Sequence, residues 1–378
     1  MKKVVVAMDS MKGCLDSLSA SRAIASGIIG QEAEVEVICV PVADGGEGTA
    51  AALAFGNCNC EKQKSQVSGP LGEEIKVEWY YDEESGTAFI DMAAAAGLAL
   101  VEESKRDPLR ASTFGVGELI MEAVGKGARK VMLGLGGSAT VDGGLGALQA
   151  MGLIEPEALT PKQTTQEETD TFIKKAGKWG IKLELLCDVV APFTGERGAA
   201  RVFGPQKGAS AEDVEVLEDR LEEIRRKVKE SRGIDLNEVP GSGAAGGLAG
   251  GLMAFAGGRI VKGASVVLDT IGFDDIIDGA DLIITGEGSS DRQTLMGKLP
   301  FEILQRGKRK GIPVWLVAGR VSDEDALLDA GFEKIICINS PEIVVKSNTL
   351  GQNPMDPKTG KRRLSYVWRT HGPCVPTD

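Results

Sequence analysis

Apolar runs that are typical of strands are followed repeatedly in this sequence by a carboxylate beside glycine, serine or threonine. In open α/β sheets ligands bind beside the carboxyl ends of the strands, so such acids are candidates for catalysis or metal binding. A single acid of this kind is commonly a helix cap or a turn residue. The same ending on five runs indicates a site built from carboxylates. The runs at 4–7, 35–42, 131–135, 183–186 and 282–285 lead to Asp9, Asp44 and Glu47, Asp142, Asp188, and Glu287 and Asp291.

The residues around these acids supply the other parts that phosphoryl transfer needs. Glycine with serine or threonine at the start of a helix offers backbone N–H groups to an anion. Lys12, Lys207 and Arg292 bring positive charge to the same loops. Carboxylate oxygens bind Mg²⁺, usually one or two of them together with phosphate oxygens. This set requires no histidine, no cysteine and no covalent intermediate, and it predicts a kinase or an ATPase.

Known nucleotide-binding signatures leave two other classes of protein open. The chain has no GxxxxGK[ST] segment, which excludes a P-loop enzyme by that criterion. Segments 134–139 and 241–246 match the glycine pattern of dinucleotide-binding turns weakly, so an NAD(P)-dependent hydroxy-acid dehydrogenase stays an alternative. The one histidine, His371, lies in a polar tail and offers no evident acid-base group for hydride transfer. A non-catalytic sugar-acid sensor is the other alternative, because clefts between α/β domains also serve binding proteins.

Composition narrows the partners of the chain. Its 378 residues suggest two domains, and 42% hydrophobic with 26% charged residues is an ordinary globular balance. The net charge of −12 argues against nucleic acid or an anionic membrane as the main partner. Seven cysteines without a CxxC pair indicate neither a disulfide framework nor a zinc ribbon. No apolar stretch approaches the roughly 20 residues that span a bilayer. We therefore expect a cytoplasmic protein.

Strand and helix patterns alternate along the chain, which predicts parallel sheets with helices on both faces. Several apolar runs are continuous, as in strands that are buried on both faces. Strands are expected at 4–7, 35–42, 131–135, 183–190, 282–285, 314–318 and 334–338, and helices at 18–29, 117–125, 144–151, 211–231 and 300–310.

The domain boundaries follow from a change of pattern in the middle of the chain. Segment 77–88 predicts a hairpin with an acidic turn, whereas the first 65 or so residues and the end of the chain read as strand-helix units. We expect a discontinuous α/β core domain of residues 1–66 and 282–378 and an inserted α/β domain of residues 67–281.

Seven segments, taken in order, resemble the bacterial type I glycerate kinase family. The resemblance extends from residue 1 to about 340, and the ordered series is more specific than any one segment. The segments are DSMKG at 9–13, PVADGGEGT at 41–49, GPLG at 69–72, GLGGSAT at 134–140, VFGPQKGA at 202–209, GAAGGL at 243–248 and TGEG at 285–288 with the residues up to 298.

The resemblance implies a kinase that uses ATP and Mg²⁺ to phosphorylate D-glycerate. It implies direct in-line transfer to the 2-hydroxyl, although the sequence itself does not distinguish the 2-hydroxyl from the 3-hydroxyl. It also implies two α/β domains: a Rossmann or restriction-enzyme-like core formed by both chain ends and an inserted flavodoxin-like domain, with the active site in the interdomain cleft. We expect a monomer or a homodimer.

The chain departs from the family pattern at a few positions. Met11 and Cys14 stand where phenylalanine and serine are commoner, and Ser289 and Ser290 stand where the family often has a pair with a cation. Arg292 is then the candidate cation of that loop. The tail at 366–373 does not resemble the helix with which such chains end.

The predicted site residues fall into four groups by role. Asp188 is the expected base for the glycerate hydroxyl, with Asp291 and Asp9 as rivals. Lys12 and Lys207 are expected to neutralise the phosphate or to clamp the substrate carboxylate, for which the planar fork of Arg292 is also suited. Asp44 and Glu47 are the expected metal ligands. The remaining expected substrate or nucleotide contacts are Asp9, Ser10, Gly45, Gly46, Thr49, Gly136, Gly137, Ser138, Thr140 and Glu287.

Overall fold

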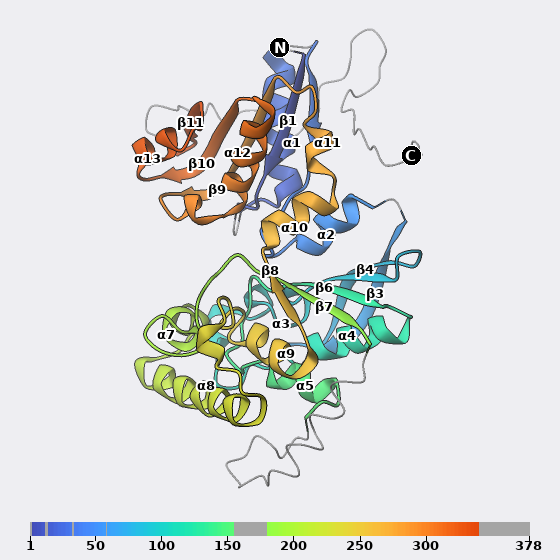
Figure 1. Ribbon diagram of the computed structural model, residues 1–378, viewed down its shortest axis with the longest axis vertical. Coiled ribbons are helices and arrows are strands. Elements are labelled where there is room, and N and C mark those ends of the chain that lie inside the picture. The colour runs from blue at the N-terminus through green and yellow to red at the C-terminus, as the bar shows by residue number, and fades with distance from the viewer. Residues whose placement is uncertain (1, 12–13, 32–33, 58, 155–179, 340–378) are drawn as a thin grey trace. The chain divides into compact units, whose positions relative to one another are not determined.

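The chain forms two compact α/β units, each around its own sheet (Figure 1). A computed structural model describes residues 2–11, 14–31, 34–57, 59–154 and 180–339. Unit 1 comprises Met1–Asp44, Phe55–Cys58 and Ala264–Asp378, and unit 2 comprises Gly45–Ala54 and Asn59–Gly263.

These bounds differ from the domains expected at 1–66, 67–281 and 282–378. Residues Cys60–Ser68 form β3 of the unit 2 sheet, and α10 (Gly263–Thr270) packs with unit 1 before β9 begins. The crossing points therefore lie near 58 and 264, and a short segment at 45–54 also belongs to unit 2. The sequence did not show these crossings because β3 is largely polar and Val67 is its one buried apolar side chain.

Unit 1 is built on a five-stranded parallel sheet in the order β11-β10-β9-β1-β2. Strand β9, from the C-terminal part of the chain, pairs directly with β1 from its start, so the two chain ends share one sheet, as expected (Figure 1). The strands are β1 (Lys3–Met8), β2 (Glu36–Cys39), β9 (Leu282–Ser290), β10 (Val314–Val321) and β11 (Lys334–Cys337), and the helices are α1 (Ser17–Gln31), α10 (Gly263–Thr270), α11 (Phe273–Ile276), α12 (Leu299–Lys310) and α13 (Glu324–Asp329).

Burial on both faces explains the continuous apolar runs of this sheet. Val4 and Val6 of β1 pack in one cluster with Ala20 and Ala25 of α1, while the intervening Val5 is equally inaccessible. Residues that alternate along a strand point to opposite faces, so both faces of β1 are covered.

Unit 2 is built on a mixed six-stranded sheet in the order β3-β4-β5-β6-β7-β8. The strands β3 to β5 are antiparallel, and β5 to β8 are parallel. The expected hairpin at 77–88 is confirmed as the β4–β5 pair. The strands are β3 (Cys60–Ser68), β4 (Glu74–Asp82), β5 (Thr87–Asp91), β6 (Lys130–Gly134), β7 (Lys182–Leu186) and β8 (Arg259–Val261), and the helices are α2 (Thr49–Phe55), α3 (Ala93–Ala96), α4 (Phe114–Gly125), α5 (Leu145–Ala150), α7 (Ala199–Phe203), α8 (Ala211–Arg232) and α9 (Leu248–Ala256).

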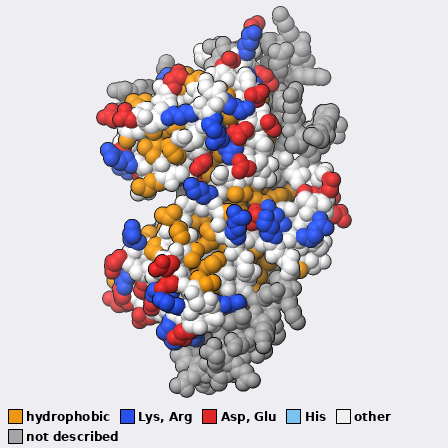
Figure 2. Space-filling model, in the orientation of Figure 1, with side chains coloured by type: hydrophobic (Ala, Val, Ile, Leu, Met, Phe, Trp, Pro, Cys, Tyr) orange, Lys and Arg blue, Asp and Glu red, His pale blue; other side chains and the backbone are white. Residues whose placement is uncertain are grey.

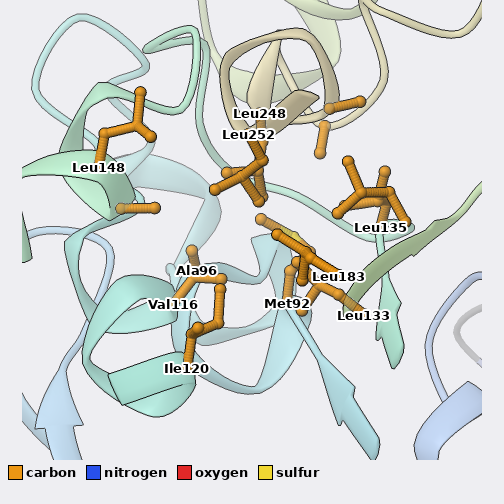
Figure 3. Close-up of a cluster of buried hydrophobic side chains, with 14 of the residues drawn as sticks. Met92, Ala96, Val116, Ile120, Leu133, Leu135, Leu148, Leu183, Leu248 and Leu252 are labelled. Atoms are coloured by element: carbon orange, nitrogen blue, oxygen red, sulfur yellow. The ribbon is translucent and has the colours of Figure 1, made fainter. Parts of the chain in front are cut away.

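The core of unit 2 joins strands and helices that are far apart in the sequence. Leu133 of β6 and Leu183 of β7 lie in one cluster with Ile120 of α4, Leu148 of α5 and Leu252 of α9 (Figure 3). This packing fixes the carboxyl ends of β5, β6 and β7 at one edge of the sheet.

The helix expected at 211–231 is confirmed as α8, which is amphipathic. Its buried stripe is Val214, Leu217, Leu221, Ile224 and Val228, at three- and four-residue spacing. A Ser210–Asp213 capping box begins the helix and Gly233 with positive φ ends it. Acidic and basic side chains mix over its exposed face (Figure 2).

Candidate active site

The loop at 45–50 lies on the carboxyl edge of the unit 2 sheet. The carbonyl oxygen of Gly45 accepts hydrogen bonds from the backbone N–H groups of Leu135 (2.8 Å) and Gly136 (3.0 Å), just after β6. Gly45 also faces the end of β7, because a Cβ atom there would lie 2.6 Å from the carbonyl oxygen of Leu186. The loop that carries Glu47 is therefore held against the ends of β6 and β7.

Glycine is required on both sides of this contact. Gly45 has φ +95°, a region that other residues rarely adopt. A Cβ atom on Gly136 would lie 2.4 Å from the Cα atom of Gly46, closer than any real Cβ contact. The glycine-rich segments at 45–46 and 134–137 thus have a packing role in addition to any role toward a ligand.

Asp91, at the end of β5, is a site residue that the sequence analysis missed. Its carboxylate accepts the N–H of Gly48 through Oδ2 (2.8 Å) and the N–H of Ala50 through Oδ1 (2.9 Å). Burial raises the pKa of Asp91 to about 7, and the neighbouring Glu47 charge acts in the same direction, whereas the two N–H groups act against it. Residues 88–90 followed by Asp91 match the rule of an apolar run ending in an acid, but they were assigned only to a hairpin.

Lys207 is a buried cation beneath the 136–140 loop. Its side chain is 3% exposed, and its Nζ donates to Ser138 Oγ (2.7 Å) and to the Thr140 carbonyl oxygen (2.7 Å). Burial lowers the pKa of Lys207 to about 7, and the charge of Asp142 opposes this shift. Lysine is almost never fully buried without a charged partner, so this position is unusual for a structural residue.

The backbone and hydroxyl groups of the 136–140 loop are partly committed to the protein itself. The Gly136 N–H is bonded to Gly45, and Ser138 Oγ accepts from Lys207. Thr140 is fully buried, and its Oγ1 has no hydrogen-bond partner among the described residues. Gly137 is exposed at the tip of the loop and has φ +79°. Of the expected loop contacts, the structure leaves Gly137 most accessible to a ligand.

Asp188 and Thr49 complete the predicted residues of unit 2. Asp188 is half-buried and lies two residues beyond the end of β7, so it shares the edge with the 136–140 loop. Thr49 is fully buried, and its hydroxyl donates to the Gly46 carbonyl oxygen (2.7 Å). Its hydroxyl therefore shapes the turn before α2.

In unit 1, β1 ends just before Asp9, whereas Glu287 lies within its partner strand β9, which continues to Ser290 and so extends beyond the run expected at 282–285. The Asp9 N–H donates to the Gly286 carbonyl oxygen (2.8 Å), and the Ser10 N–H donates to Asp9 Oδ1 (2.7 Å). Glu287 is 7% exposed and accepts hydrogen bonds from Thr294 Oγ1 (2.6 Å) and from Lys298 Nζ (3.2 Å). Glu287 thus ties the end of β9 to the start of α12.

The loop after β9 holds two further predicted residues. Asp291 is half-buried and its Oδ1 accepts the Gln293 N–H (2.7 Å) within the turn. Arg292 has a 74% exposed side chain and its Nε contacts Asp323 Oδ1 (3.3 Å). Lys12 and the tail at 366–373 lie outside the described residues.

The donor set of the predicted metal ligands suits Mg²⁺. Asp44 is half-buried and Glu47 is exposed, and both offer hard carboxylate oxygens. Among the described residues, no group of three or more His, Cys, Asp or Glu side chains is placed to hold a metal ion. Mg²⁺ commonly takes only one or two carboxylates and completes its shell with phosphate oxygens and water.

Neither glycine pattern has the arrangement of a dinucleotide-binding turn. In that fold the helix opens within the motif, whereas α5 begins only at Leu145, well past segment 134–139. In the second pattern, Cβ atoms on Gly243 and Gly246 would lie 2.1 Å from Pro192 O and 1.9 Å from Thr140 O. Close packing accounts for these glycines.

The structure is a two-sheet α/β protein with carboxylates, glycine-rich loops and a buried lysine near its strand ends. These are the groups that phosphoryl-transfer enzymes use. Residues 4–353 match the sequence model of the Glycerate kinase family. The chain belongs to the glycerate kinase family and is an enzyme of this type.

Individual relatives agree with this assignment. The chain is 35% identical to the glycerate kinase of Halalkalibacterium halodurans, over 97% of this chain and 98% of that protein. It is 37% identical to the glycerate 2-kinase of Escherichia coli K12, over 85% and 86%. A crystal structure described as glycerate kinase 2 of Salmonella typhimurium LT2 superposes with a TM-score of 0.68 at 34% identity, covering 87% of this chain and 94% of that one. None of the helices within the described residues is long and apolar enough to cross a bilayer.

Proposed function

We propose that the protein transfers the γ-phosphoryl group of ATP to the 2-hydroxyl of D-glycerate. The observation that carries this proposal is the family match, which spans the site loops of both units, together with relatives named glycerate kinase and glycerate 2-kinase. The net charge of −12 supports a small-molecule partner rather than nucleic acid. We propose a cytoplasmic monomer or homodimer.

The reaction we propose is a direct displacement. The 2-hydroxyl oxygen forms a bond to the γ-phosphorus while the bond to the ADP oxygen breaks, and the hydroxyl proton passes to Asp188. A carboxylate suffices as the base, because positioning contributes more than basicity in a loose transition state. Asp291 and Asp9 are the alternative proton acceptors.

The remaining residues bind and orient the substrates in this proposal. Asp44 and Glu47 hold Mg²⁺, which would neutralise phosphate charge when bound. The buried charge of Lys207 supports the 136–140 loop from below and attracts an anion to it. Arg292 is proposed to hold the glycerate carboxylate, which would exchange for its present contact with Asp323.

The first experiment is a coupled assay of ADP release with ATP, Mg²⁺ and D-glycerate, with L-glycerate and no-acid controls. We expect turnover that depends on D-glycerate. The variant Asp188→Asn keeps the shape of the side chain but loses the base, so we expect kcat to fall by about 10²-fold or more with a smaller change in KM. Asp219→Asn, an exposed acid on α8, is the matched control.

Two results would reject this proposal. Binding of D-glycerate without ATP turnover would favour the sugar-acid sensor. Quenching of nicotinamide fluorescence on binding, with oxidation of a hydroxy acid, would favour the dehydrogenase. If Asp188→Asn retained the activity of Asp219→Asn, the base would have to be Asp291 or Asp9.

A further inference from the structure

Asp91 fastens one end of the 45–50 loop to the sheet. Its two carboxylate oxygens each take one backbone N–H, from Gly48 at 2.8 Å and from Ala50 at 2.9 Å. These residues are more than 40 positions away in the sequence, with separations of 43 and 41. The contacts are therefore tertiary, and no element other than β5 supplies the acceptor for this pair of N–H groups in the described chain.

The other end of the loop is fastened by β6. Gly45 accepts the N–H groups of Leu135 and Gly136, so the loop is bound on both sides of Gly46 and Glu47. The fit beside Asp91 is tight, because a Cβ atom on its sheet partner Gly134 would lie 2.8 Å from Asp91 Oδ1. The hydrogen bonds at both ends of the loop restrict the backbone conformation of Glu47.

We propose that Asp91 is a positioning residue: it holds Glu47 where its carboxylate would bind the Mg²⁺ ion that accompanies the nucleotide phosphates. The metal part of this inference rests on the proposed function. Asp91 acts through the loop, because its carboxylate accepts two N–H groups that both lie on the C-terminal side of Glu47. Two hydrogen bonds to one side chain restrain the loop more firmly than a single bond would.

The same sheet contains a matched control residue. Asp82, at the end of β4, is 4% exposed and its Oδ1 accepts the N–H groups of Glu84 (3.0 Å) and Ser85 (3.3 Å). Because β4 and β5 are antiparallel, Asp82 lies at the edge of the sheet opposite to Asp91. Asp82→Asn therefore disturbs a buried acid of the same kind without touching the 45–50 loop.

The test compares Asp91→Ala and Asp91→Asn with Asp82→Asn in the full chain, by two readouts that do not require turnover. The first is hydrogen exchange of the Gly48 and Ala50 amides. The second is the calorimetric affinity for ADP with and without Mg²⁺. Asparagine keeps the size of the side chain but offers one acceptor oxygen, so it preserves folding if the alanine variant unfolds.

We expect Asp91→Ala to speed exchange of both amides by about tenfold or more, because each amide loses its hydrogen-bond acceptor. The Mg²⁺-dependent gain in ADP affinity should shrink by about tenfold, with ADP affinity in the absence of Mg²⁺ unchanged. Asp91→Asn should fall between Asp91→Ala and the wild type, and Asp82→Asn should match the wild type in both readouts.

Three results would overturn the inference. Unchanged exchange in both Asp91 variants would show that the loop is held without Asp91. Faster exchange with a normal Mg²⁺ effect would show that the anchor does not position a metal ligand. Equal losses in Asp82→Asn would show a general effect of destabilising the sheet. A wild type that binds ADP equally with and without Mg²⁺ would instead refute the metal role in the proposed function, and the exchange data would still decide whether Asp91 holds the loop.

Discussion

Lys207 makes the stability of unit 2 depend on pH in a way that a single substitution should remove. Burial lowers its pKa from 10.5 to about 7. Below that pH the folded protein therefore holds a protonated Lys207 amine whose desolvation costs free energy, whereas the unfolded chain keeps the same group in water. This lowering of the pKa corresponds to roughly 5 kcal/mol at pH values well below 7.

The sign follows from the number of bound protons. Between about pH 7 and 10.5 the unfolded chain holds the Lys207 proton more often than the folded chain does, so this residue makes the free energy of unfolding rise with pH. From pH 7.5 to 9.5 the two pKa values give a rise of roughly 2–3 kcal/mol. Below pH 7 both states are protonated and the contribution is flat.

We expect Lys207→Met to lack this rise. The variant also leaves Ser138 and the Thr140 carbonyl without the ammonium, at a cost of about 1–3 kcal/mol for each buried group, but that cost does not depend on pH. The assay is urea unfolding from pH 6 to 9.5, followed by hydrogen exchange of β6 peptides so that unit 2 is observed. Lys64→Met, with a 78% exposed side chain, is the control.

The quantity of interest is the difference in unfolding free energy between the wild type and Lys207→Met. It should change by roughly 2–3 kcal/mol from pH 7.5 to 9.5, whereas the difference for Lys64→Met should stay constant. Parallel curves for the wild type and Lys207→Met would refute the reasoning, because Lys207 would then titrate equally in the folded and unfolded states.

Two further substitutions test the packing of the site loops. Gly136→Ala should lower the melting temperature and reduce kcat/KM by about tenfold or more, because the new Cβ atom would lie 2.4 Å from the Cα atom of Gly46. Gly27→Ala, whose Cβ atom would have nothing within 4 Å, should leave stability unchanged or raise it slightly. Equal behaviour of the two glycine variants would contradict the close approach. Lys298→Met should destabilise unit 1 by about 1 kcal/mol in thermal unfolding, because it removes the 3.2 Å contact with the buried Glu287. The loss should not be larger, because the lysine side chain is partly solvated. No loss of stability would mean that the hydroxyl groups of Thr294 and Ser290 alone satisfy the Glu287 carboxylate.

Much of the fold could be predicted because most strands here are buried on both faces. The run at 4–7 and most of the runs at 131–135 and 282–285 are apolar, and the structure places them in or directly beside β1, β6 and β9. Strand β3 was missed because its sequence, CEKQKSQVS, is mostly solvent-facing, and β8 because it has only three residues. A short or exposed strand leaves little pattern from burial.

The candidate site was predicted in its residue types more than in its contacts. The rule of an acid after a strand holds for Asp9 and Asp188, whereas Glu287 lies inside β9. The same rule would have found Asp91 had segment 88–90 been considered as a parallel strand. The burial of Lys207 could not be predicted, since its contacts are 67 and 69 residues away in the sequence. Tertiary contacts of this kind depend on the packing of whole elements.

The central claim is that the chain phosphorylates D-glycerate, and ³¹P NMR of the reaction mixture tests it most directly. With purified protein, ATP, Mg²⁺ and D-glycerate, we predict loss of the ATP γ-phosphate resonance. One phosphomonoester resonance should grow, with the same chemical shift as added 2-phosphoglycerate. A resonance matching 3-phosphoglycerate would refute the assignment of the hydroxyl. Inorganic phosphate alone, or an unchanged ATP spectrum in the presence of D-glycerate, would contradict the claim itself.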